Sequence, residues 1–237
     1  MVILSRNDIE RIAERVIQAY KKLPEFENKK VYNISPKILL ERLLNLRIDY
    51  GHLSQDRQTL GVTITRVAGE VEIYNACDEA EIYLLDGRTV LIEQDLRDDA
   101  TQKGRHNMTQ MHEACHHILE RIFPGEYCCG HSKKFRCIKE KGPRVIEDWE
   151  EWQVDTLSAA IIMPKDLVKQ ALYLFGFNGR IPLINRIHAK EDYMQFSMVA
   201  DFLGVSKQAL SIRLSHLGLV DRNDFYDPYA LLDVYNE

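Results

Sequence analysis

The feature that most constrains this chain is the run His112-Glu113-Ala114-Cys115-His116, which has the form His-Glu-x-x-His. Apolar residues flank the run and predict that it lies on a helix. Residues four apart on a helix share a face, so His112 and His116 direct two imidazole rings to one point. Imidazole is a common zinc ligand, and Glu113, one step around the helix, can reach a water on such an ion. The motif therefore predicts a hydrolytic metal site whose third protein ligand lies elsewhere.

The alternative is a chance match on an amphipathic helix. A buried helix that turns two histidines and a glutamate inward is costly unless these side chains bind something, which favours the metal site. His117 breaks the four-residue spacing and points to another face, so we interpret it as a packing or surface histidine.

Composition sets the broad class of the protein. A chain of 237 residues can form one domain of ordinary size, or one domain with a small module. The net charge of -5 gives no global basic field for nucleic acid or an anionic membrane. No apolar run approaches the roughly 20 residues that span a bilayer, and the first residues lack the apolar core of a signal peptide. Five cysteines, with a vicinal pair at Cys128-Cys129, fit reduced thiols, and we expect a soluble, cytoplasmic protein.

The N-terminal region predicts two helices. Ser5 is a suitable N-cap, with Asp8 three residues on, for an amphipathic helix that runs to about Leu23. Ser35-Pro36 supplies a cap and a first-turn proline for a second helix, which ends near Leu46.

Ile48 and Tyr50 suggest the start of a strand, and from Leu60 to Leu96 the pattern changes to the alternation that is typical of short strands. The alternating pairs are Val62/Ile64, Val71/Ile73, Ile82/Leu84 and Val90/Ile92. Asp86-Gly87 fits a two-residue hairpin turn between the last two of these strands, since glycine tolerates positive φ. We expect an α+β fold with a small, mostly antiparallel sheet beside the metal helix.

A Cys- and Lys-rich loop follows the helix stop at Pro124 and extends to about Pro143. Its metal-binding residue types are Cys128, Cys129, His131 and Cys137. Vicinal cysteines strain a tetrahedral zinc site and no Cys-x-x-Cys pair is present, so ordinary loop thiols are favoured over a second zinc site.

Residues 146–163 predict another helix, which Pro164 ends. Glu151 and Asp155 are four residues apart on it. If Glu151 reaches the metal, Asp155 is placed to accept a hydrogen bond from the free N–H of a zinc-bound histidine. The alternative is a solvated acidic face, which suffices for Glu147, Asp148 and Glu150.

Together these motifs resemble the ImmA/IrrE family of zinc metallopeptidases, over most of the chain. The segments that carry the resemblance are Gly104–His116, Glu151-Trp152-Gln153-Val154-Asp155 and Ala159-Ala160-Ile161-Ile162-Met163-Pro164. The resemblance implies a zincin-like metallopeptidase domain over residues 1–168, with His112, His116 and Glu151 as zinc ligands, Glu113 as the general base, and Asp155 behind the ligands. The chain departs from the family at Cys115, where glycine is frequent, and at Met108-Thr109, where Phe-Thr is usual.

Residues 169–237 predict a helical segment of helix-turn-helix type with an acidic tail. Ser197 and Ser206 are candidate N-caps of its two helices, and Gly204 and Gly218 candidate ends. The side chains suited to DNA are Lys207, Gln208, Arg213 and His216, and the acidic tail holds Asp221, Asp224, Asp227 and Asp233. With so few cations, we favour packing or substrate docking over direct DNA binding.

The expected function is zinc-dependent, site-specific proteolysis. The resemblance implies a helix-turn-helix transcriptional repressor as the substrate, encoded beside the protease on a mobile element or in a stress regulon. Two alternatives stay open: a DNA-binding or antirepressor regulator that acts without proteolysis, and a structural zinc domain. Arg105, His106 and His131 are the candidates for stabilising the oxyanion.

Overall fold

The computed structural model describes residues 2–65, 68–127, 134–138 and 149–230, without side chains for 134–138. The chain is α+β and divides into two compact units. Unit 1 comprises Met1–Val31 and Ser35–Ile162, and unit 2 comprises Tyr32–Ile34 and Met163–Glu237. The division thus falls six residues before the boundary expected at residue 168. Among the described helices, none has the length and apolar content needed to cross a bilayer.

Helix α1 (Arg6–Lys21) starts unit 1 with the predicted capping box. The Ser5 hydroxyl accepts from the backbone N–H of Asp8, and the Asp8 carboxylate accepts from the N–H of Ser5. Burial of Ile9, Ala13 and Ile17 along one face confirms the predicted amphipathic helix.

The second predicted helix forms, but its geometry changes along its length. After η1 (Pro24–Phe26), the Ser35 hydroxyl caps α2 (Pro36–Ile38), which continues directly as the π-helical turn η2 (Leu39–Leu43). Asn45 then takes a positive φ of 53° and ends the helical run just before Leu46. A wide turn of this kind cannot be read from apolar spacing, which is nearly the same in both helix types.

The main sheet has four strands in the order β1-β5-β2-β6. These are β1 (Arg47–Gly51), β2 (Thr59–Ile64), β5 (Thr89–Glu93) and β6 (Lys134–Ile138). β1 is parallel to β5, while β2 is antiparallel to both β5 and β6, so the sheet is mostly antiparallel as predicted. Every residue of β2 and β5 is buried, which places these two strands at the centre of unit 1.

The hairpin predicted around Asp86-Gly87 is wrong. β4 (Ala80–Leu85) pairs with β3 (Gly69–Tyr74) in a separate two-stranded sheet, and β5 joins the main sheet instead. Gly87 has the expected positive φ of 74°, and Asp86 accepts from the N–H of Arg88. The glycine turn itself was therefore predicted correctly, but a tight turn does not determine whether the strands on either side of it pair with each other.

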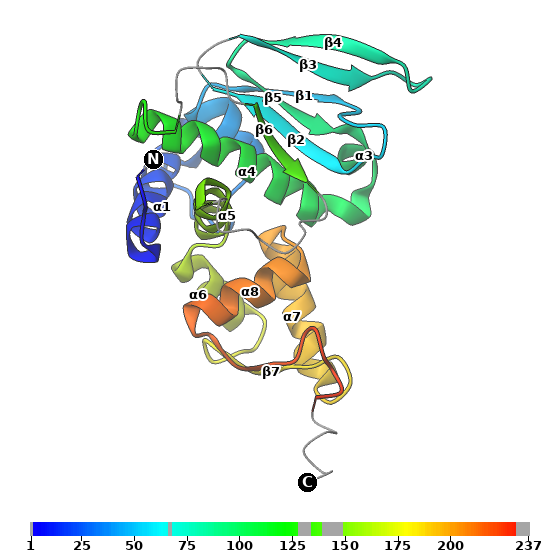
Figure 1. Ribbon diagram of the computed structural model, residues 1–237. Coiled ribbons are helices and arrows are strands. Elements are labelled where there is room, and N and C mark those ends of the chain that lie inside the picture. Colours follow the sequence, from blue (N-terminus) through cyan, green and yellow to red (C-terminus); the bar gives the residue numbers. More distant parts are fainter. Residues whose placement is uncertain (1, 66–67, 128–133, 139–148, 231–237) are drawn as a thin grey trace. The chain divides into compact units, whose positions relative to one another are not determined.

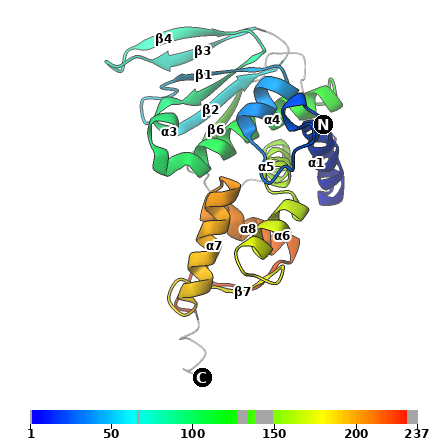
Figure 2. The same ribbon diagram turned by 180° about the vertical axis from the view of Figure 1, so that it is seen from behind.

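Unit 1 is layered, as Figures 1 and 2 show from opposite sides. The β3–β4 hairpin covers one face of the main sheet over an apolar core that includes Val71, Leu85 and Leu91. Helix α4 (Lys103–Ile122) crosses the other face, reached through α3 (Gln94–Asp98) and η3 (Ala100–Gln102). Helix α5 (Trp149–Ile162) packs between α4 and α1. Covered on two sides, α4 is buried continuously from Thr109 to Glu120.

Unit 2 contains α6 (Lys165–Leu174), β7 (Ile181–Ile184), α7 (Lys190–Leu203), α8 (Lys207–Leu217) and β8 (Val220–Asn223). The cap expected at Ser197 is wrong, because α7 already begins at Lys190 and the Ser197 hydroxyl donates to the Tyr193 carbonyl inside it. Ser206 caps α8 as predicted, and Gly204 and Gly218 close α7 and α8 in the left-handed conformation. The helix pair is thus present, with a longer first helix.

Candidate metal centre

The two motif histidines lie one turn apart on α4 and face the same point. Their Nε2 atoms are 3.2 Å apart, and only 4% of the His112 side chain and 1% of the His116 side chain are exposed. Two ring nitrogens this close need a shared proton or a cation between them. The helix geometry inferred from sequence therefore holds for this pair.

Glu151 of α5 meets the histidine pair from a different element. Its Oε2 lies 3.2 Å from His112 Nε2 and its Oε1 lies 3.6 Å from His116 Nε2. The three side chains can each offer one ligand atom, with all three atoms within 4.8 Å of one another. About a quarter of the Glu151 side chain is exposed, so Glu151 is the most exposed of the three residues.

Asp155 approaches from behind, one turn further along α5. Its Oδ1 accepts a hydrogen bond of 3.0 Å from His112 Nδ1. With its proton on Nδ1, a neutral His112 presents a lone pair at Nε2 toward His116 and Glu151. The carboxylate also fixes the plane of the imidazole ring. This is the arrangement that the four-residue spacing of Glu151 and Asp155 suggested.

The separations within the cluster allow a test of fit. A tetrahedral zinc ion held at about 2.0 to 2.2 Å from nitrogen and oxygen would set neighbouring ligand atoms about 3.3 to 3.6 Å apart. The two Nε2 atoms are 3.2 Å apart, and the nearest Glu151 oxygen lies 3.2 Å from His112 (Oε2) and 3.6 Å from His116 (Oε1), so the carboxylate can bind the ion through one oxygen or both. His112, His116 and Glu151 therefore fit such an ion, with its fourth position left for a non-protein ligand.

Glu113 is fully buried and lies against the sheet. A Cβ placed on Gly61 of β2 would lie 2.6 Å from Glu113 Oε1 and 2.8 Å from Thr109 Cγ2. The absence of a side chain at Gly61 is thus what lets this carboxylate lie over the strand. Sequence reasoning missed Gly61, although a glycine inside an otherwise β-branched and apolar strand is a known mark of close backbone approach.

Two neighbours of the ligands belong to the packing of α4. His117 is buried, with its Nε2 2.7 Å from the Thr63 hydroxyl, and burial lowers its pKa to about 4. Cys115 is completely buried, which raises its thiol pKa to about 12. His117 is therefore a packing histidine rather than a surface one, and Cys115 is a packed small residue without thiolate character.

The candidates for oxyanion stabilisation differ in their surroundings. His106 is half-buried on α4, where its Nε2 lies 2.9 Å from Gln110 Nε2 and 3.3 Å from the Tyr50 hydroxyl. Arg105 is exposed and donates to the Gln102 side chain. His131 lies outside the described residues. The hydrogen bonds of the two described candidates, Arg105 and His106, are thus with residues outside the histidine–glutamate cluster.

A second group of metal-binding residue types consists of His52, Glu93 and Asp95. Glu93 is buried, and both of its oxygens already accept hydrogen bonds, from His52 Nδ1 at 2.7 Å and from the Leu53 N–H at 2.9 Å. These bonds tie the end of β5 to the segment after β1, so we interpret the group as structural. The four residues of the other candidate zinc site, Cys128, Cys129, His131 and the side chain of Cys137, lie outside the described residues.

The side chains of α8 that are of a type suited to DNA are not all at the surface. Arg213 is buried and its Nε donates to the Met163 carbonyl at 3.0 Å, so it supports unit 2 from within. Lys207 is exposed over the Tyr193 ring, and Gln208 and His216 are also exposed. The set of cations that α8 can offer to a phosphate backbone is thus smaller than its sequence suggests.

The chain was also compared with known proteins. It matches no protein-family model and no curated protein.

Proposed function

We propose that this chain is a zinc-dependent, site-specific endopeptidase with a zincin-like domain, as its resemblance to the ImmA/IrrE family suggests. The observation that carries the proposal is the convergence of His112, His116 and Glu151, whose ligand atoms lie within 4.8 Å of one another. Two of these residues come from one helix and the third from another. Their meeting is therefore a property of the fold and not of local sequence.

The neighbouring side chains have distinct tasks in this proposal. A zinc ion would supply Lewis-acid chemistry, polarising a peptide carbonyl and lowering the pKa of a water toward about 7. Glu113 accepts the proton of the attacking water and passes it to the leaving amine. Asp155 holds His112 in the tautomer that turns Nε2 toward the ion.

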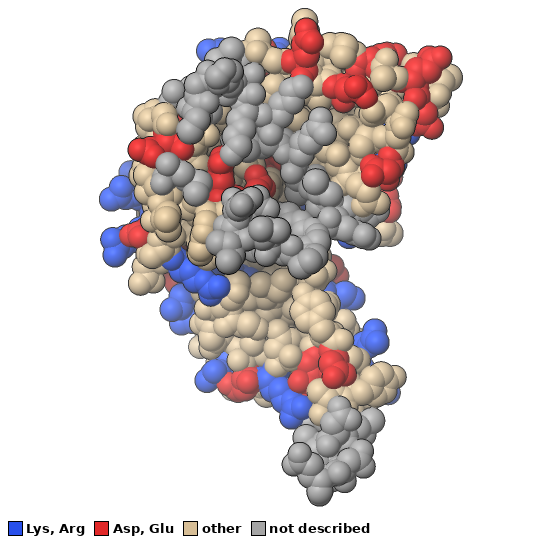
Figure 3. Space-filling view, viewed as in Figure 1, with Lys and Arg blue, Asp and Glu red and all other residues tan. Residues whose placement is uncertain are grey.

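For the substrate, we propose a helix-turn-helix repressor met in the cytoplasm, in a regulatory system on a mobile element or in a stress response. The acidic charge of one surface supports the choice of a basic protein as substrate. Residues 69–85, which form the β3–β4 hairpin, hold five acidic residues and neither lysine nor arginine. Figure 3 shows acidic side chains gathered on this part of unit 1. A surface of this sign attracts a DNA-binding domain by its complementary potential.

The test is proteolysis of the neighbouring repressor by zinc-loaded protein. We expect cleavage at one or very few bonds, with casein left largely intact and with cleavage abolished by a chelator and by Glu113→Gln. Glu113→Gln should retain one zinc ion, because residue 113 is not a ligand. Glu126→Gln, an exposed change beyond the end of α4, is the matched control and should cleave normally.

Three results would overturn the proposal in different ways. Rapid degradation of casein would indicate a general protease. A repressor that stays whole, while the Glu113→Gln protein lowers its DNA affinity, would indicate a stoichiometric antirepressor. Protein with one zinc ion and no open coordination position would indicate a structural domain.

A further inference from the structure

Unit 1 contains an apolar groove that the proposed proteolysis does not use. It has a volume of about 390 Å³, which is within the range of ligand-binding pockets. Its lining residues come from helix α1, from the C-terminal part of α4, and from Leu43 and Leu44 at the end of η2. The apolar lining consists of Ile12, Val16, Ala19, Leu43, Leu44, Ile118 and Ile122. No residue of the histidine–glutamate cluster lines it.

The groove carries cationic groups from both helices. Arg15 of α1 and Arg121 of α4 line it, and none of the described residues that line it is acidic. Arg121 donates to the Leu44 carbonyl at 2.7 Å, which fixes its guanidinium while leaving further N–H donors. Among the described residues, Arg15 has no ion-pair partner. An anion entering the groove would therefore meet two guanidinium groups and no opposing carboxylate.

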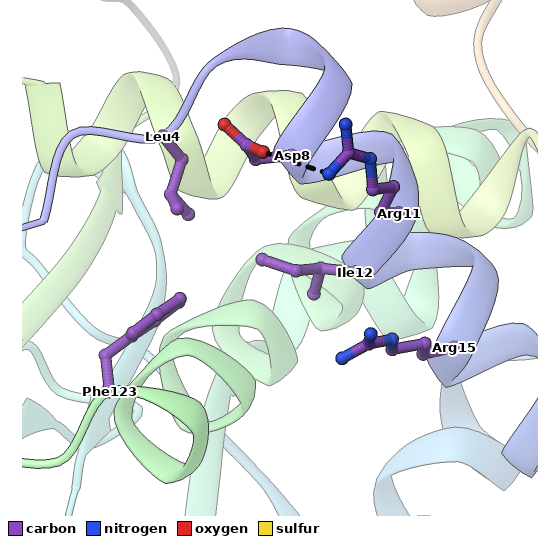
Figure 4. Close-up of a pocket in the computed structure, with 6 residues that line it drawn as sticks. All are labelled: Leu4, Asp8, Arg11, Ile12, Arg15 and Phe123. Carbon is purple, nitrogen blue, oxygen red and sulfur yellow. Dashed lines mark ion pairs between the residues drawn. The ribbon is translucent and has the colours of Figure 1, made fainter.

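A smaller hollow of about 220 Å³ adjoins the groove and shares Ile12 and Arg15 with it. Figure 4 shows Leu4, Ile12 and Phe123 turned toward the same space, with the Arg15 guanidinium on the same side of α1. Asp8 is the acidic residue of this hollow, and it is paired with Arg11. The two cavities thus meet at Ile12 and Arg15, and both have apolar lining residues.

Part of the groove lining comes from an unusual turn. Leu43 closes the π-helical segment η2, and Leu44 follows it. π-Helical turns are rare and are found frequently at functional sites. Here the wide turn places two leucines at the groove and presents the Leu44 carbonyl to Arg121.

We propose that this groove binds an amphipathic carboxylate, of the class of medium-chain fatty acids. Its alkyl chain covers the aliphatic lining, and burial of that area provides most of the affinity. Its carboxylate lies between Arg15 and Arg121, because the guanidinium fork matches a carboxylate in shape and charge. The groove is separate from the metal cluster, so the proposal does not depend on proteolysis.

Decanoate is the probe, titrated calorimetrically onto the full chain. We expect saturable binding, with decanol and butyrate each at least tenfold weaker, because the first lacks the charge and the second most of the chain. Arg15→Gln should weaken decanoate at least tenfold. Arg6→Gln, an exposed change on the same helix outside the groove, should leave binding within twofold.

A second pair of variants tests the location without touching charge. Ala19 lines the groove, so Ala19→Trp should fill it and abolish binding, whereas Gln18→Trp on the adjacent, non-lining residue should not. Thermal unfolding of all variants without ligand shows that they fold. Equal binding of decanol, undiminished binding by Ala19→Trp, or binding only of an acidic helical peptide would each overturn the proposal. Repeating the decanoate titration with Glu113→Gln measures binding in a variant without the proposed proteolytic activity.

Discussion

Gly61 of β2 and Glu113 of α4 are in direct contact across the interface between sheet and helix, with only 2.6 Å between Glu113 Oε1 and the position that a Cβ on Gly61 would occupy. Real Cβ atoms do not approach an oxygen so closely, so any side chain at Gly61 must displace this carboxylate. The strand residue therefore controls where the proposed general base lies.

The first prediction follows from this contact. Gly61→Ala should lower kcat for the cognate substrate by about 100-fold, within the usual range for loss of a positioned acid–base group, while zinc content stays at one ion per chain. The measurement is kcat together with metal content. Ser54→Ala, a change before the same strand and away from Glu113, is the control. Normal activity in Gly61→Ala would show that the carboxylate position is unimportant.

The second prediction concerns the ligand set. Glu151→Ala should lose most of its zinc affinity, because two imidazoles alone leave the ion under-coordinated. Glu150 is the adjacent residue of α5 and does not belong to the cluster. Glu150→Ala should therefore keep full metal content. Zinc competition with a chelator measures both affinities. Equal loss in the two variants would mean that the third ligand is wrongly assigned.

The third prediction separates the hydrogen bond of Asp155 from its charge. Asp155→Ala should weaken zinc affinity or activity by about 10- to 100-fold, since His112 loses the acceptor that fixes its ring. Asp155→Asn can still accept from Nδ1–H through its amide oxygen and should lie between the alanine variant and the wild type. Wild-type affinity in Asp155→Ala would remove the residue from the site.

The fourth prediction is a pH effect at the hairpin. The Tyr83 hydroxyl donates to Asp49 at 2.6 Å, and this bond raises the pKa of Tyr83 to about 12. The neutral phenol is favoured in the folded state, so its stabilisation is complete below about pH 10 and is lost as the pH rises toward 12. The free energy of unfolding should thus exceed that of Tyr83→Phe at pH 9, and the difference should disappear near pH 12. A difference that grows with pH would contradict this sign.

Much of the site could be predicted because it depends on local helix geometry. The spacing of His112 and His116 fixes a shared face, and the same rule relates Glu151 to Asp155. The contact between Gly61 and Glu113 depends on the register of a strand against a helix, which no local pattern encodes. The predicted strand pairing at Asp86-Gly87 was wrong for the same reason, since a turn sequence does not determine which strands pair. Arg213 was misjudged because a long cationic side chain looks solvent-exposed until its buried carbonyl partner is known.

The last prediction places substrate recognition on the hairpin. On its outer face Ile82 lies opposite Glu72 and Leu84 opposite Glu70, and these two aliphatic side chains are 63% and 70% exposed. Exposed aliphatic residues ringed by like charges are typical of a docking surface for a partner of opposite charge. A basic repressor would use it before its scissile bond reaches the metal cluster.

Charge reversal tests this placement. Glu70→Lys combined with Glu72→Lys should lower kcat/KM for the folded repressor at least tenfold at low salt, and the loss should shrink as salt screens the charges. A short peptide around the cleavage site, which cannot reach the hairpin, should be cut at the wild-type rate by the same variant. Glu14→Lys combined with Glu27→Lys makes an equal change in net charge at exposed positions elsewhere and serves as the control. If both double variants slow repressor cleavage equally, only net charge matters. If cleavage of the peptide slows as well, the hairpin change has disturbed the catalytic centre. Either result rejects docking on this face.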